Sequence, residues 1–213
     1  MATALKITEA VDAIAFRAFA NKKIVVTNRD EDMFKLQCPR LYMPFGVSCF
    51  EPEYGGPAKY TVDFTLNGHD EEGSFVNRFI TEFRALEDKI CHEVVAQSEA
   101  IFNGQTKTFS EVKSMFTSAI RDDNAGWPPK LKAKVDVTSD GRAFKSHFYD
   151  EDGNPRTDEP ARGIYARASG RSILELSSIW FFNGKIGALW KVNQLTVYEP
   201  EDKSLPAFAF KNV

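Results

Sequence analysis

Apolar positions repeat with two different periods along this chain. Alternation over Lys59–Leu66 and Lys130–Thr138 predicts half-buried strands, because successive strand residues point to opposite sides. From Ser74 to about Gln97 the spacing changes to three and four, which predicts a long amphipathic helix with Ser74 as its N-cap. A shorter helix is predicted over Ser110–Ile120. The pattern indicates strands interrupted by a helical block.

Turn and proline signals divide the remaining strands. Met33–Phe50 is extended but contains Pro39 and Pro44, which indicates one kinked strand or two short ones. Asp140-Gly141 predicts a tight turn, with Ala143–Tyr149 as the strand that pairs across it.

The longest extended stretch is Ser172–Tyr198, and it folds back at Asn183-Gly184, a dipeptide that favours a type I′ hairpin turn. Just before the turn, alternation puts Trp180 and Phe182 on one side and Ile179 and Phe181 on the other, so one pair should lie in the core. The pattern does not assign Trp190, on the returning strand, to the core or the surface. Large rings interleaved with lysines are typical of a stacking platform for unpaired bases, although a strand tryptophan more often belongs to a core.

Together these elements predict a mainly β fold with five to seven strands: a small antiparallel oligonucleotide/oligosaccharide-binding (OB) barrel with an inserted long helix and a short second helix. An open α+β sandwich is the alternative. The predicted organisation is an N-terminal extension of mixed structure at 1–32, one OB domain at 33–199 and a C-terminal tail at 200–213.

Charge is distributed unevenly along a chain of 213 residues with a formal net charge of −3. Eleven acidic and four basic residues fall in 51–100, whereas eleven basic and eight acidic residues fall in 130–191. Any site for a polyanion must therefore be local. Lys130, Lys132 and Lys134 share one side of one strand, about 6.5–7 Å apart, which suits phosphates. The alternative is that these lysines protect an edge strand from aggregation.

Catalytic and metal-binding patterns are lacking in the sequence. It contains no HExxH, GxSxG, Walker or Rossmann motif, and its three cysteines form no CxxC pair. The composition favours a soluble, reduced, intracellular protein without cofactor, metal or membrane span, and not an enzyme.

Three phrases carry a resemblance to a known family: FGVSCFEPEYGGPAKYTVDFTL at 45–66, WPPKLKAKV at 127–135 and SSIWFFNGKIGALWKVNQL at 177–195. In this order they resemble the single-stranded DNA-binding proteins of large nucleocytoplasmic DNA viruses. More remotely, they are similar to the replication single-strand binding protein of short-tailed bacteriophages. The resemblance implies the OB barrel and a role in viral DNA replication, recombination and repair, inside the infected host cell or in the virion. The phage proteins end in a long acidic tail that recruits replication partners, whereas this chain ends in EPEDKSLPAFAFKNV.

The expected function is sequence-tolerant binding of single-stranded DNA, by base stacking on rings and by lysine and arginine contacts to phosphate. Replication proteins are further expected partners, and self-association through the tail or an edge strand is expected. The alternative function is a structural or virion-assembly protein that uses its barrel for protein contacts. The candidate DNA-binding residues are Trp180, Phe182, Trp190, Tyr42, Lys130, Lys132, Lys134, Arg171, Lys185 and Lys191.

Overall fold

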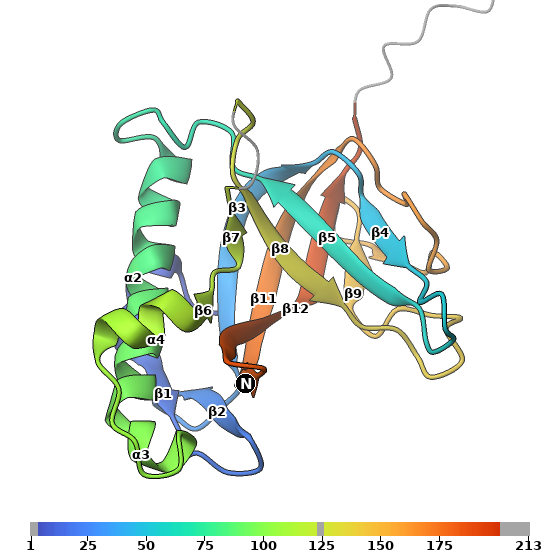
Figure 1. Ribbon diagram of the computed structural model, residues 1–213. Coiled ribbons are helices and arrows are strands. Elements are labelled where there is room, and N and C mark those ends of the chain that lie inside the picture. The colour runs from blue at the N-terminus through green and yellow to red at the C-terminus, as the bar shows by residue number, and fades with distance from the viewer. Residues whose placement is uncertain (1–3, 123–125, 201–213) are drawn as a thin grey trace, which may run out of the picture.

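The computed structural model describes residues 4–122 and 126–200, which form one curved sheet with helices against one side (Figure 1). The predicted tail, apart from its first residue, lies outside the described residues. The helices are α1 (Ile7–Ala13), α2 (Phe75–Ala96), α3 (Ser98–Ile101) and α4 (Phe109–Met115). The longer strands are β2 (Lys23–Asn28), β3 (Phe34–Met43), β4 (Val47–Phe50), β5 (Lys59–Thr65), β8 (Lys130–Val135), β11 (Ala168–Phe182) and β12 (Lys185–Tyr198). The short strands are β1 (Ile14–Phe16), β6 (Phe116–Thr117), β7 (Ile120–Arg121), β9 (His147–Tyr149) and β10 (Pro155–Arg156).

Five strands form a path of pairings that returns to its start. β11 pairs with β3, β3 with β5, β5 with β8, β8 with β12, and β12 again with β11. The β8–β12 contact is parallel and the others are antiparallel. Two links are single residue pairs, Tyr42 with Thr65 and Lys191 with Lys134. The mainly β prediction is confirmed. We call this path the five-strand ring, and its inner side is the one that carries buried Phe64, Leu131 and Leu174.

The long hairpin is built as its sequence predicts. Asn183 and Gly184 both have positive φ, 47° and 71°, which is the backbone of a type I′ turn. β11 and β12 extend from this turn for 15 and 14 residues and pair over most of their length. A register shift between Leu176 and Ile179 reverses which residues of β11 point inward.

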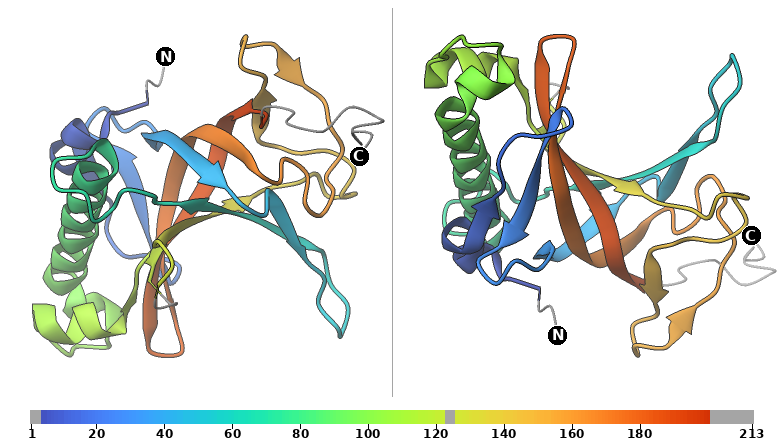
Figure 2. Two further views of the ribbon diagram at one scale, coloured as in Figure 1. Left: turned by 90° about the horizontal axis from the view of Figure 1, so that it is seen from above. Right: turned by 90° about the horizontal axis from the view of Figure 1, so that it is seen from below.

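The long helix α2 stands beside the strands with α1 and α4 (Figures 1 and 2), and its Phe83 ring lies 5.2 Å from the Trp190 ring of β12. Its predicted N-cap is confirmed, because the Ser74 hydroxyl accepts a hydrogen bond from the Asn77 N–H at 3.0 Å. The buried stripe of the helix begins at Phe79 and not at Phe75, which is 61% exposed. No helix in the described ranges is long and apolar enough to cross a membrane.

Two predicted elements differ from the structure. The second helix ends at Met115 and not at Ile120, because the chain there turns into β6 and β7, which pair with β12 and β8. The stretch Ala143–Tyr149 does not form a hairpin strand with β8. Only β9 is a strand, and it pairs with β12 and β10, while one bridge, Val137 with Phe144, remains of the predicted hairpin.

The predicted N-terminal extension packs into the same body as the rest of the chain. α1 packs on α2, and β2 pairs antiparallel with the hairpin strand β11, where Lys23 lies opposite Trp180. Pro39 lies where the pairing of β3 with β11 shifts register, so the sequence signal for a kink corresponds to a bulge.

Candidate nucleic-acid interface

The outer side of β5 and β8 carries the predicted row of lysines. Leu131, Ala133 and Val135 are buried, so the alternate residues of β8 point outward. The antiparallel register places Lys132 directly opposite Asp63 and Lys130 opposite Thr65. The structure therefore brings Lys130, Lys132 and Lys134 together on one surface, as the alternation predicts.

Two carboxylates neutralise three of the candidate lysines. The Lys132 ammonium lies 3.2 Å from the Asp63 carboxylate. Asp136 accepts hydrogen bonds from both Lys134 and Lys191, each at 2.6 Å. A phosphate that binds here must compete with these carboxylates.

The pKa of Asp136 is set by two opposing effects. Partial burial raises it, but the hydrogen bonds and positive charges of Lys134 and Lys191 outweigh burial and hold the pKa below its usual value. Asp136 is therefore ionised at neutral pH, and it holds β8 and β12 together where they share a single bridge.

Exposed rings lie on the same outward surface as the lysines. Tyr42, 37% exposed, is paired with Thr65, which in turn lies opposite Lys130. The Phe45 ring, 56% exposed, lies 5.2 Å from the Lys130 nitrogen. Exposed Phe50 lies opposite Lys59 on the neighbouring strand pair. Rings on β3, on β4 and in the connection between them thus lie beside cations on β5 and β8.

Trp180 lies across the backbone of Gly187, its partner on β12. A Cβ atom added to Gly187 would come within 2.3 Å of the indole ring. The ring needs a glycine beneath it, and it is partly buried on the outer side. Phe182, two residues on, is 69% exposed, whereas Ile179 is buried and Phe181 packs edge-on against Phe19. The predicted division of these four residues into two sides is confirmed.

The outward row of β12 joins the hairpin rings to the lysines of β8. This row is Lys185, Gly187, Leu189 and Lys191, of which Gly187 is buried beneath Trp180, and Lys191 is bridged to Lys134. Lys185 is exposed next to Phe182, which it pairs with. Trp180, Phe182 and Lys185 therefore lie on one outer surface that continues to Lys130, Lys132 and Lys134.

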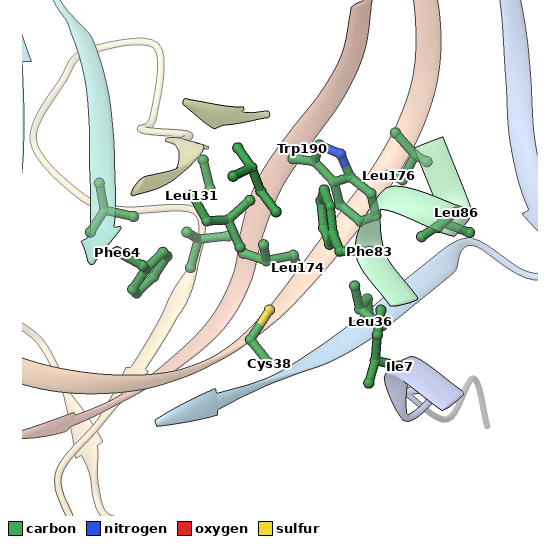
Figure 3. Close-up of a cluster of buried hydrophobic side chains, with 14 of the residues drawn as sticks. Ile7, Leu36, Cys38, Phe64, Phe83, Leu86, Leu131, Leu174, Leu176 and Trp190 are labelled. Atoms are coloured by element: carbon green, nitrogen blue, oxygen red, sulfur yellow. The ribbon is translucent and has the colours of Figure 1, made fainter. Parts of the chain in front are cut away.

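Trp190 is the candidate that the structure removes from this surface. It is 2% exposed and lies inside the ring, 5.2 Å from the Phe83 ring of α2 and 6.3 Å from Phe34 (Figure 3). Its prediction as a stacking residue is wrong, because it lies opposite buried Leu176 on the inner side of the hairpin. Its indole N–H has no hydrogen-bond partner within residues 4–122 and 126–200.

Arg171 lies on the outer side of β11, in a different part of the surface from the lysines. It is directly opposite Arg40 of β3, and the Arg40 guanidinium stacks on the Tyr198 ring at 4.0 Å. Tyr42 is two residues beyond Arg40 and points the same way, so it lies between the arginines and Lys130.

Several exposed groups on or beside this surface were not predicted from the sequence. Arg40 follows Pro39, a proline that signals a kink, so the sequence offered a hint that it is exposed. Its position opposite Arg171 is visible only in the fold. Four further rings are exposed: Phe45, Phe50, Tyr54 and Trp127. Alternation alone does not distinguish them from rings of the core. Across the described part of the chain, His, Cys, Asp and Glu form no cluster of three that could hold a metal.

No protein-family model matches this chain, and no curated protein matches it. Among solved structures, it is similar to the single-stranded DNA-binding protein from bacteriophage Enc34 in complex with single-stranded DNA, at 10% identity and a TM-score of 0.48 over 89% of this chain and 97% of the phage chain. A C-terminal truncation of the phage protein gives 11% identity and a TM-score of 0.43 over 90% and 98% of the two chains. At these values the likeness assigns no function to this chain, and the viral family suggested by the sequence stays a prediction.

Proposed function

We propose that this protein binds single-stranded DNA on the outer side of its five-strand ring, without sequence preference and without making or breaking bonds. The observation that carries the proposal is that rings and cations lie together on one surface, from Phe182 and Trp180 through Lys134 and Lys130 to Tyr42. Bases stack on rings of any sequence, and lysines follow the phosphates.

We further propose that the ring is an OB barrel. Taken in chain order, β3, β5, β8, β11 and β12 would be its first to fifth strands. The surface that binds oligonucleotides in this fold is the side of the second and third strands, flanked by the first and last of its loops. Here that surface is β5 and β8 with their lysines. The flanking segments are the β3–β5 connection, with Phe45 and Phe50, and the Asn183-Gly184 turn, beside Phe182. Figure 2 shows the β4–β5 loop and the β11–β12 hairpin projecting from the body.

A role in viral DNA replication, recombination and repair is proposed from the sequence resemblance. It requires only that the protein cover unpaired strands as they appear. The alternative, a virion-assembly protein that binds other proteins through the same exposed rings, predicts no preference for single strands.

A gel-shift assay with a single strand, a duplex of the same length and no DNA separates these two functions. We expect a shift with the single strand and a weaker one with the duplex, because paired bases offer no open faces for stacking. Phe182→Ala and Lys185→Ala should each weaken the single-strand shift, whereas Lys145→Ala, exposed in the β8–β9 loop, serves as the control. Equal binding to both DNA forms, or no shift, would reject the proposal.

A further inference from the structure

A groove of about 680 Å³ lies beside the outer surface, between α1, the first turn of α2 and the bulge of β3. Three cations line it: Lys6, Arg40 and Arg171. No acidic residue of the described chain is among its lining residues, and neither arginine forms an ion pair within residues 4–122 and 126–200. This differs from the lysine row, where Lys132, Lys134 and Lys191 each have a carboxylate partner.

The two arginines are placed where an anion would stabilise them. Arg40 and Arg171 are directly opposite each other on adjacent strands, an arrangement that is unfavourable for like charges unless a negative group lies between them. Guanidinium groups bind phosphate through paired hydrogen bonds. Tyr198 stacks on Arg40 at 4.0 Å and restricts its orientation. Phe75 and Val76, the first two residues of α2, also line the groove, so the positive end of a 22-residue helix faces it.

The groove also offers an apolar wall of the kind a base requires. Phe75, the first residue of α2, is 61% exposed, and Pro39 is another apolar residue of the lining. An exposed ring in the same groove as two arginines provides both contacts that a nucleotide makes, stacking and phosphate binding.

The groove is continuous with the lysine surface. Tyr42 follows Arg40 by two residues on the same side of β3, and Thr65 and Lys130 follow on the next two strands. At ordinary strand geometry the path from Arg40 to Lys130 is about 12 Å, short enough for one strand of DNA to contact both.

We propose that this groove is a second binding segment for the same single strand, with a phosphate held between Arg40 and Arg171 and a base against Phe75. The inference rests on the proposed function and extends it, because it makes the site longer than the β5–β8 surface. Within residues 4–122 and 126–200, its two arginines have no carboxylate to displace, unlike Lys132, Lys134 and Lys191.

The experiment compares oligo-dT of about 4 and about 16 nucleotides, the range of site sizes known for one OB fold. In the Arg40→Gln/Arg171→Gln variant, we expect the long oligomer to bind at least tenfold more weakly. Its salt slope should fall by about 0.7, the contribution of the one phosphate that the two arginines share on a single strand. The short oligomer, which the lysine surface can hold alone, should bind as in the wild type. Phe75→Leu should weaken the long oligomer only, by at least about fivefold.

The charge-matched control is Arg29→Gln/Arg84→Gln. It removes two exposed arginines that lie away from the groove, one in the β2–β3 turn and one on the solvent-facing side of α2. It should leave both oligomers nearly unaffected. Thermal melting confirms that each variant is folded.

Wild-type affinity and salt slope for the long oligomer in the Arg40→Gln/Arg171→Gln variant would overturn the inference. If poly-L-glutamate then bound the wild type but not this variant, the groove would belong to an acidic peptide. Failure of the wild type to bind either oligomer would reject the proposed function itself.

Discussion

At the scale of single residues, the two hairpin tryptophans show what alternation can and cannot decide. Trp180 and Phe182 could be separated from Ile179 and Phe181 because the four are consecutive. Trp190 shares its side of β12 with Ile186, which pairs with Phe181, but only the fold shows that this side is the inner one. Sequence therefore predicts which residues share a side within a strand, whereas the fold decides which side is inner.

Gly187→Ala tests whether the Trp180 ring is positioned by the glycine beneath it. The new Cβ would come within 2.3 Å of the ring, so the ring must move and DNA affinity should fall toward that of Trp180→Ala, by about 1–3 kcal/mol. In the Trp180→Ala background, Gly187→Ala should cost almost nothing more. Titration of the two single variants and the double variant gives this coupling. Additive losses would mean that the contact does not position the ring.

Asp136→Asn tests the competition between carboxylate and phosphate. It removes the acceptor charge of both Lys134 and Lys191, so single-stranded DNA should bind more tightly and with a steeper salt slope. Asp63→Asn, which releases only Lys132, should have a smaller effect in the same direction. Oligo-dT titrations at several salt concentrations measure both. Weaker binding in Asp136→Asn would show that the carboxylate positions the lysines and does not compete with DNA.

At the scale of elements, local signals predicted helices and turns better than strand partners. The Ser74 cap, the stripe of α2 and the Asn183-Gly184 turn are confirmed because each depends on residues a few positions apart. The pairing of β9 with β12 and not with β8 was missed because it joins distant segments, with Gln194 opposite His147. Pairings of this kind depend on the packing of the whole sheet.

Glu87 of α2 joins the helix to the segment before β7, and its burial makes the attachment sensitive to pH. The carboxylate is 1% exposed and accepts hydrogen bonds from the Ser118 hydroxyl at 2.7 Å and the Ala119 N–H at 2.9 Å. Burial raises the pKa of Glu87, and the charge of Asp88 raises it further. The two hydrogen bonds and the charge of Lys113 lower the pKa, but burial outweighs them, so the net shift is upward.

Because the folded pKa of Glu87 is raised, the native state binds a proton more readily than the unfolded chain. The contribution of Glu87 to stability is therefore fully present below the usual glutamate pKa of about 4.3. It is lost as the pH rises through the pKa that Glu87 has in the folded protein. Glu87→Gln keeps an acceptor but cannot ionise, so its stability relative to the wild type should rise over this window. Denaturant unfolding of both proteins measures the difference. Glu87→Leu should cost about 1–3 kcal/mol from unpaired donors at all pH values. A constant difference between wild type and Glu87→Gln would contradict this account.

At the scale of the whole molecule, an acidic chain carries a local cationic surface. The basic excess of residues 130–191 was visible in the sequence, and the structure shows that much of it is paired with carboxylates, which leaves the arginines of the groove without partners among the described residues. The pairings of β3 with β5 and of β8 with β12 could not be read from the sequence, since each is a single bridge between strands that lie far apart along the chain.

The central claim is that unpaired bases stack on the outer surface beside Trp180. The variant Trp127→Phe/Trp190→Phe leaves Trp180 as its only tryptophan, so its fluorescence reports this ring alone. Titration with oligo-dT at low and high salt should quench the emission, with an affinity that falls steeply as salt rises. A folded variant that shows neither quenching nor salt-dependent binding would contradict the account.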